Sequence, residues 1–231
     1  ISVDVVGRGH SDWLDNPADY DHYPLYLSDA VSLVTHIQSQ YTKRIILDWV
    51  GISMGGLIGM VLAAQPDIPF SIHKLIMSDI GPFIPASALL RMSDYVGKDL
   101  RFDNFDEFEA YIKKISASFG PLTDKQWRHL AIHSVREYAD GSVGFRYDPG
   151  ISSSLDKREI EDIDLWAQWD VLDTPTLVMH GMESDVLLPE IVAKMKKRGA
   201  KADVAELPGI GHAPVLMTNH EISIVSDYLQ A

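Results

Sequence analysis

The stretch Gly51-Ile52-Ser53-Met54-Gly55-Gly56 decides the fold of this chain. An apolar run at residues 45–50 precedes it, and a run typical of a helix follows at residues 57–64. A Gly-x-Ser-x-Gly motif between a strand and a helix makes a sharp turn that projects the serine oxygen above the sheet, and glycines leave room for that turn. The unpaired N–H groups at the start of the helix can stabilise a developing anion. The motif therefore predicts that Ser53 is a nucleophile.

A nucleophilic serine of this kind needs a histidine and an acid, and candidates for both lie at later strand ends. An apolar strand predicted at residues 176–181 leads to Asp185. Another strand, predicted at residues 202–207, leads to His212 on a glycine-rich loop. Asp79 is a second candidate for the acid, because it ends the strand that follows the serine motif.

Four segments of the chain, in this order, resemble those of α/β-hydrolases, within the group of small serine esterases and related hydrolases that carry a helical cap. They are residues 4–11, 51–56, 173–185 and 209–212. The resemblance implies an α/β fold with a mostly parallel sheet, flanking helices and an inserted helical cap. It also implies a catalytic triad, and an oxyanion hole that includes the backbone N–H of Met54.

The implied triad consists of Ser53, His212 and an acid. Members of the family usually take the acid from a loop after the cap, which favours Asp185. Some members take it from the earlier strand, where Asp79 stands, so Asp79 is kept as the alternative. If Asp185 is the acid, we expect Asp79 to anchor the entry to the cap by accepting backbone hydrogen bonds.

The pattern of elements predicts two parts. Strands and helices alternate up to Asp79, which favours a parallel sheet with helices on both faces. We expect an α/β core formed by residues 1–79 and 166–231, and a helical cap at residues 80–165. The helices expected in the cap cover residues 87–96, 106–119 and 123–139.

The beginning of the chain departs from the family pattern. Family members usually carry three further strands, and a His-Gly type loop that donates the second oxyanion N–H, before the segment that opens this chain. Residues 1–4, Ile-Ser-Val-Asp, already resemble the fourth strand. We therefore expect that the sequence lacks an N-terminal portion, the alternative being a minimal fold with a smaller sheet. In either case the second oxyanion donor is not assigned.

Composition argues against several other classes of function. The 231 residues carry a formal net charge of −13, which disfavours nucleic acid and anionic membrane surfaces as partners. The chain has no Cys, which rules out thiolate zinc sites and fits a reducing compartment such as the cytoplasm. No apolar run reaches the ~18 residues that span a bilayer. His129 and His133 stand four positions apart without an evident third ligand, so we expect no metal, and we expect no cofactor.

Together these features predict a serine hydrolase that cleaves a small carboxylic ester, thioester or lactone through an acyl-enzyme. The expected partner is a small-molecule acyl substrate. Two alternatives stay open. The Ser-Met-Gly-Gly of the motif also resembles carbon–carbon bond hydrolases that act on meta-cleavage products. Some proteins of this fold are instead ligand-binding receptors with slow hydrolysis.

Overall fold

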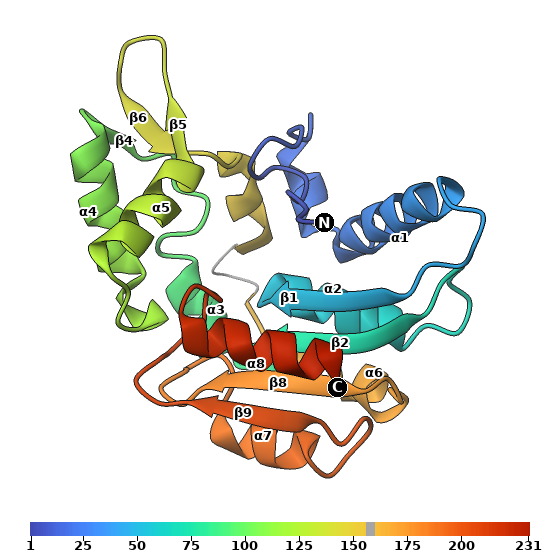
Figure 1. Ribbon diagram of the computed structural model, residues 1–231. Coiled ribbons are helices and arrows are strands. Elements are labelled where there is room, and N and C mark those ends of the chain that lie inside the picture. Colours follow the sequence, from blue (N-terminus) through green and yellow to red (C-terminus); the bar gives the residue numbers. More distant parts are fainter. Residues whose placement is uncertain (156–159) are drawn as a thin grey trace. The chain divides into compact units, whose positions relative to one another are not determined.

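Four parallel strands form the central sheet of the computed structural model, which describes residues 1–155 and 160–231 (Figure 1). Their order across the sheet is β1, β2, β8 and β9, and each neighbouring pair is parallel. The strands are β1 Leu47–Ile52, β2 Ile72–Ser78, β8 Thr176–Gly181 and β9 Asp203–Leu207. Every residue of β8 is buried, as expected for an inner strand covered on both faces. The predicted fold class, a mostly parallel sheet flanked by helices, is confirmed.

Helices α2 (Met54–Ala63) and α8 (Asn219–Gln230) cover opposite faces of this sheet (Figure 1). Side chains alternate between the two faces along a strand, and β2 follows that rule. Leu75 and Met77 lie under the glycines of α2, whereas Ile76 packs on the side of α8. The Lys74 ammonium donates to the carbonyls of residues 228 and 229 at the C-terminal end of α8, where the helix dipole favours a cation.

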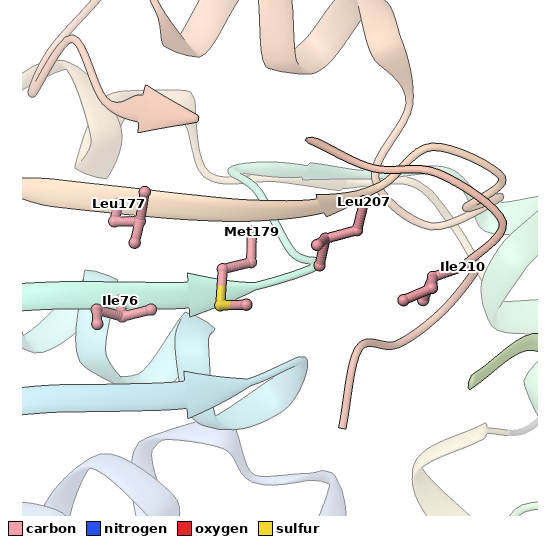
Figure 2. Close-up of a cluster of buried hydrophobic side chains, with 5 residues drawn as sticks. All are labelled: Ile76, Leu177, Met179, Leu207 and Ile210. Carbon is pink, nitrogen blue, oxygen red and sulfur yellow. The ribbon is translucent and has the colours of Figure 1, made fainter. Parts of the chain in front are cut away.

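A cluster of buried apolar side chains lies on the face of the sheet that α8 covers. Figure 2 shows the five buried members of this cluster. Its members come from three strands and from the loop after β9: Ile76, Leu177, Met179, Leu207 and Ile210. The residues of α8 packed against them are Ile224, Val225, Tyr228 and Leu229. Ile210 stands two residues before His212, so the same cluster anchors the loop that carries the histidine.

Contacts within the chain divide it into two units, and the sheet belongs to the one formed by Leu27–Ala86, Ser118–Pro121 and Glu161–Ala231. A short antiparallel ribbon in this unit pairs the residues just after β2 with residues shortly before β8. The remaining elements of these segments are β3 Phe83–Ile84, β7 Ile163–Asp164, α6 Trp166–Asp170 and α7 Pro189–Met195. Helix α1 (Tyr23–Ser39) begins in the other unit and ends in this one.

The other unit combines Ile1–Tyr26, Ser87–Ala117 and Leu122–Ile160. Buried Phe108 packs edge-to-face against Phe102 and Phe145, with ring centroids 5.6 and 5.0 Å apart. The elements that lie wholly in this unit are η1 Pro17–Asp21, β4 Arg101–Phe102, α4 Phe105–Ile115, α5 Asp124–Ser134, β5 Val135–Glu137, β6 Val143–Phe145 and η3 Pro149–Leu155. Two elements have residues in both units, α3 Ala86–Met92 and η2 Ala117–Phe119. The cap range 80–165 remains a prediction, and its residues 156–159 lie outside the described residues.

The last predicted cap helix, residues 123–139, is partly wrong. A capping box of Thr123 and Gln126 opens α5, but the helix ends at Ser134. Residues 135–137 instead form β5, which pairs with β6 in a three-stranded antiparallel sheet of order β4, β6, β5. The hairpin between them turns at Gly141, whose φ of +86° suits glycine. Strand pairing therefore overrides the local helical pattern beyond Ser134.

The strand predicted at residues 1–4 is also absent from the structure. These residues are exposed and belong to no strand. The Asp4 carboxylate accepts the N–H of His10 at 2.9 Å, and the Ser11 hydroxyl donates to the Asp4 carbonyl at 2.6 Å. The segment thus folds back on its own loop rather than pairing with the sheet.

We expect Tyr20→Phe to destabilise the protein. Tyr20 is buried, and burial together with Asp148 raises its pKa to about 12, so the phenol stays protonated. Its hydroxyl donates to Asp148 Oδ2 at 2.7 Å and accepts the Leu14 N–H at 2.9 Å. The variant leaves both groups without this partner, at a cost of about 1–3 kcal/mol in the free energy of unfolding. Urea unfolding measures that cost, with Tyr26→Phe as the control that removes one longer bond of 3.2 Å. Equal stability of Tyr20→Phe and the parent protein would contradict the expectation.

Candidate active site

Ser53 lies at the sharp turn between β1 and α2, as the sequence predicts. Its φ of +49° is in the left-handed region, and its N–H donates to the Ser78 carbonyl at 3.0 Å. A Cβ on Gly51 would come within 2.2 Å of the backbone of Gly55, so position 51 requires glycine. At Gly55, by contrast, a Cβ would meet no described atom within 4 Å. Close packing therefore explains the first glycine of the motif but not the second.

The imidazole of His212 contacts this serine. The loop after β9 brings His212 Nε2 to 3.0 Å from Ser53 Oγ, and the histidine side chain is only 9% exposed. The two residues are 159 positions apart in sequence, and the parallel sheet brings the ends of their strands to one edge. The predicted pairing of Ser53 with His212 is present in the structure.

The carboxylate that contacts His212 is that of Asp79. Asp79 Oδ2 lies 2.9 Å from His212 Nδ1, and its side chain is fully buried. The second oxygen, Oδ1, accepts the N–H of Gly181 at 2.9 Å. Asp79 follows the end of β2 with a φ of +51°, and its N–H donates to the Met179 carbonyl of the neighbouring strand. Its two oxygens are therefore fixed between the end of β8 and the histidine loop.

This geometry favours the second of the two candidate acids. The sequence favoured Asp185, but the structure leaves the Asp185 side chain exposed on the loop after β8. That loop turns tightly, because Ser184 Oγ accepts the N–H groups of Val186 and Leu187 at 3.1 Å each. The alternative acid, Asp79, is the one that meets His212. It also accepts a backbone hydrogen bond, the role that the sequence assigned to it if Asp185 were the acid.

The contacts define how protons can be held at this site. A carboxylate at Nδ1 favours the tautomer in which Nδ1 carries the proton. Nε2 of His212 is then free to accept the hydroxyl proton of Ser53. Met54 is the first residue of α2, so its N–H has no acceptor within the helix and carries part of the positive end of the helix dipole.

Three contacts that sequence reasoning missed hold the histidine loop. The Gly211 N–H donates to the Ser118 carbonyl at 2.7 Å, and the Ser118 hydroxyl donates to the His212 carbonyl at 2.7 Å. The Ser78 hydroxyl donates to the Pro214 carbonyl at 3.0 Å. Ser118 lies between α4 and α5, 94 residues from the histidine in sequence, and no local pattern signals such a contact.

The role of Gly181 was missed as well, although a glycine as the last residue of an apolar strand is a visible signal. A Cβ at this position would come within 2.5 Å of the Gly211 carbonyl oxygen. The position therefore admits the histidine loop and at the same time supplies the N–H that Asp79 accepts.

The histidine pair on α5 lies apart from these residues in sequence. The rings of His129 and His133 are 4.3 Å apart between centroids. Within residues 1–155 and 160–231, no group of three His, Cys, Asp or Glu side chains is arranged to hold a metal ion. No helix in the same ranges is both long and apolar enough to cross a membrane.

A sharp strand–serine–helix turn on a parallel sheet, with a histidine and a buried carboxylate at the same edge, is the arrangement of α/β-hydrolases. The chain belongs to the alpha/beta hydrolase family, whose model matches residues 1–222. It is a hydrolase.

Individual relatives share most of this chain. It is 40% identical to a 3-hydroxybutyrate-oligomer hydrolase of Cupriavidus necator, over 99% of this chain and 78% of that protein. Among solved structures it is similar to a hydrolase from Rickettsia typhi, with 33% identity, a TM-score of 0.84, and coverage of 97% of this chain and 74% of that one. An alpha/beta hydrolase from Novosphingobium aromaticivorans matches with 29% identity, a TM-score of 0.82, and coverage of 98% and 78%.

Proposed function

We propose that this hydrolase cleaves carboxylic esters with Ser53 as the nucleophile, His212 as the general base and Asp79 as the acid that orients the histidine. The observation that carries the proposal is the continuous chain of contacts from Ser53 Oγ to His212 Nε2 at 3.0 Å and from His212 Nδ1 to Asp79 Oδ2 at 2.9 Å. A serine hydroxyl is a weak nucleophile until an adjacent base accepts its proton.

In the proposed reaction His212 takes the Ser53 proton as the serine oxygen attacks the ester carbonyl. The tetrahedral oxyanion lies against the N–H of Met54. Collapse of this intermediate breaks the ester bond, and His212 gives its proton to the leaving alcohol. Water then attacks the acyl-enzyme with His212 again acting as base, which releases the acid and restores Ser53. The buried Asp79 carboxylate stabilises the imidazolium in both steps.

The proposed substrates are short oligomers of 3-hydroxybutyrate and related small esters. The relative of Cupriavidus necator is named for 3-hydroxybutyrate oligomers, and 40% identity over 99% of this chain supports a similar substrate class. In such an oligomer the hydroxyl of one unit is esterified by the carboxyl of the next. One hydrolytic step thus releases a free hydroxyl and a free carboxylate, which is the chemistry that a seryl acyl-enzyme performs. Thioesters and lactones of similar size are further candidates.

A panel of substrates tests this proposal. The purified protein is offered 3-hydroxybutyrate trimer, p-nitrophenyl butyrate and a ring-cleavage dienoate, and product formation is followed by chromatography. We expect the trimer and the butyrate ester to turn over and the dienoate to persist. Faster consumption of the dienoate would favour a carbon–carbon bond hydrolase. Thermal stabilisation by the trimer without turnover of any substrate would favour a receptor.

A further inference from the structure

We propose that Trp49 is a positioning residue that holds the oxyanion donor, Met54, in place through the first turn of α2. This inference rests on the proposed function. Trp49 lies on the face of β1 that α2 covers, while alternate residues of the strand are exposed on the other face. Its indole Nε1–H donates to the carbonyl oxygen of Gly55 at 2.9 Å. Gly55 is the second residue of α2 and stands two positions after the nucleophile.

The Gly55–Gly56 peptide is held at both ends. Its oxygen accepts the Trp49 indole N–H, and its N–H donates to the Ser53 carbonyl at 2.9 Å. A peptide unit is planar, so fixing its oxygen fixes the direction of its N–H. The contact of Trp49 therefore extends, through one rigid peptide, to the Ser53 carbonyl.

The Ser53 carbonyl in turn belongs to the peptide that ends in the Met54 N–H. It accepts from Gly56 at 2.9 Å and from Leu57 at 3.2 Å. By the same planarity, these bonds aim the Met54 N–H toward the place where the oxyanion forms. Three consecutive links thus connect the indole to the oxyanion donor: Trp49 to Gly55, Gly56 to Ser53, and Ser53 to Met54.

A glycine in helix α2 leaves room for the indole of Trp49. A Cβ at Gly59 would come within 2.4 Å of Trp49 Cδ1 and 2.6 Å of Nε1, so a side chain there would displace the ring. In an α-helix the Gly55 carbonyl accepts the N–H four residues later, and the indole is a second donor to it. The hydrogen bond from the indole lies close to Ser53, whose φ of +49° is a strained backbone conformation. Strain of this kind persists only where neighbouring groups over-determine the backbone.

Trp49→Phe keeps an aromatic ring and removes the indole N–H. Loss of a complete oxyanion donor costs about 10²–10³ in kcat, so a loosened donor is expected to cost about tenfold. The substrate KM is expected to change by less than about twofold, because the donor acts mainly on the transition state. A boronic acid that binds Ser53 as a tetrahedral adduct should bind about tenfold more weakly, in proportion to kcat.

Trp169→Phe is the matched control. Trp169 also donates its indole N–H to a backbone carbonyl at 2.9 Å, that of Arg198, and it is fully buried in the same unit of the chain. We expect this control to lose stability while kcat and the inhibition constant of the boronic acid stay within about twofold of the parent values. The ratio of that inhibition constant to KM does not depend on the fraction of folded enzyme, so partial unfolding of either variant does not obscure the result.

The outcomes distinguish failure of the positioning role of Trp49 from failure of the proposed esterase function. A tenfold rise of the inhibitor-to-KM ratio in Trp49→Phe alone supports the positioning role. A ratio equal to that of the parent enzyme overturns it, while esterase activity of the parent leaves the proposed function intact. Ester turnover that survives Ser53→Ala unchanged overturns the proposed function, and the inference about Trp49 falls with it.

Discussion

Ser53→Ala is expected to lower kcat for p-nitrophenyl butyrate by about 10⁶-fold, because the variant lacks the hydroxyl oxygen that carries the acyl group in the proposed reaction. The fold should persist, since the hydroxyl makes one side-chain hydrogen bond, to His212. The same variant should also escape labelling by a fluorophosphonate that forms a covalent bond with an activated serine. Mass spectrometry of the labelled parent protein should find the modification on the peptide that contains Ser53.

Ser184→Ala controls for general effects of serine removal, because its hydroxyl serves the loop after β8 rather than the histidine. We expect this variant to be labelled at Ser53 at close to the parent rate. Label recovered on a different serine, or unchanged turnover by Ser53→Ala, would exclude Ser53 as the nucleophile.

Asp79→Asn is expected to lower kcat by about 10⁴-fold, because an amide at this position favours the wrong tautomer of His212. The side-chain oxygen can still accept the Gly181 N–H, but the amide nitrogen would then face Nδ1 of His212 and donate to it. Nε2 would carry the remaining ring proton and could not accept the one from Ser53. Steady-state kinetics with p-nitrophenyl butyrate measure the effect.

Asp185→Asn is the matched control, and it should keep kcat within about twofold, because the carboxylate that contacts Nδ1 of His212 is that of Asp79. The pair of variants decides between the two acids that the sequence left open. If Asp185→Asn loses activity and Asp79→Asn keeps it, the assignment from the geometry is wrong.

Most of the sheet could be predicted because its signals are local. A few consecutive residues are enough to recognise each of three features: the apolar strands, the turn at Ser53 and the glycine loop before His212. A parallel sheet then brings the carboxyl ends of its strands to one edge, so the meeting of Ser53 and His212 follows from the order of elements. The same reasoning found both acids that could join them.

Choosing between Asp79 and Asp185 required information that is not local. Both follow strands that end at the same edge, and the difference lies in where each side chain points after its strand. Asp79 turns inward because its backbone is bound to Met179 and its carboxylate to Gly181. The hairpin after Ser134 was missed for a similar reason, since its pairing with residues 143–145 outweighs the helical preference of the preceding run.

The double contact between Ser118 and the histidine loop bears on how this enzyme can be recombined with its relatives. In sequence, Ser118–Pro121 lies between Ser87–Ala117 and Leu122–Ile160 of the other unit, yet it groups with the sheet. Ser118 contacts the backbone of both Gly211 and His212. A chimera that exchanges residues 87–160 as one piece replaces Ser118 and its contacts together with the segments on either side. Grafts that leave residues 118–121 in place preserve the two contacts of Ser118 with the His212 loop. We therefore expect chimeras that exchange residues 87–117 and 122–160 as two separate pieces to be more stable than one that also replaces the tetrapeptide.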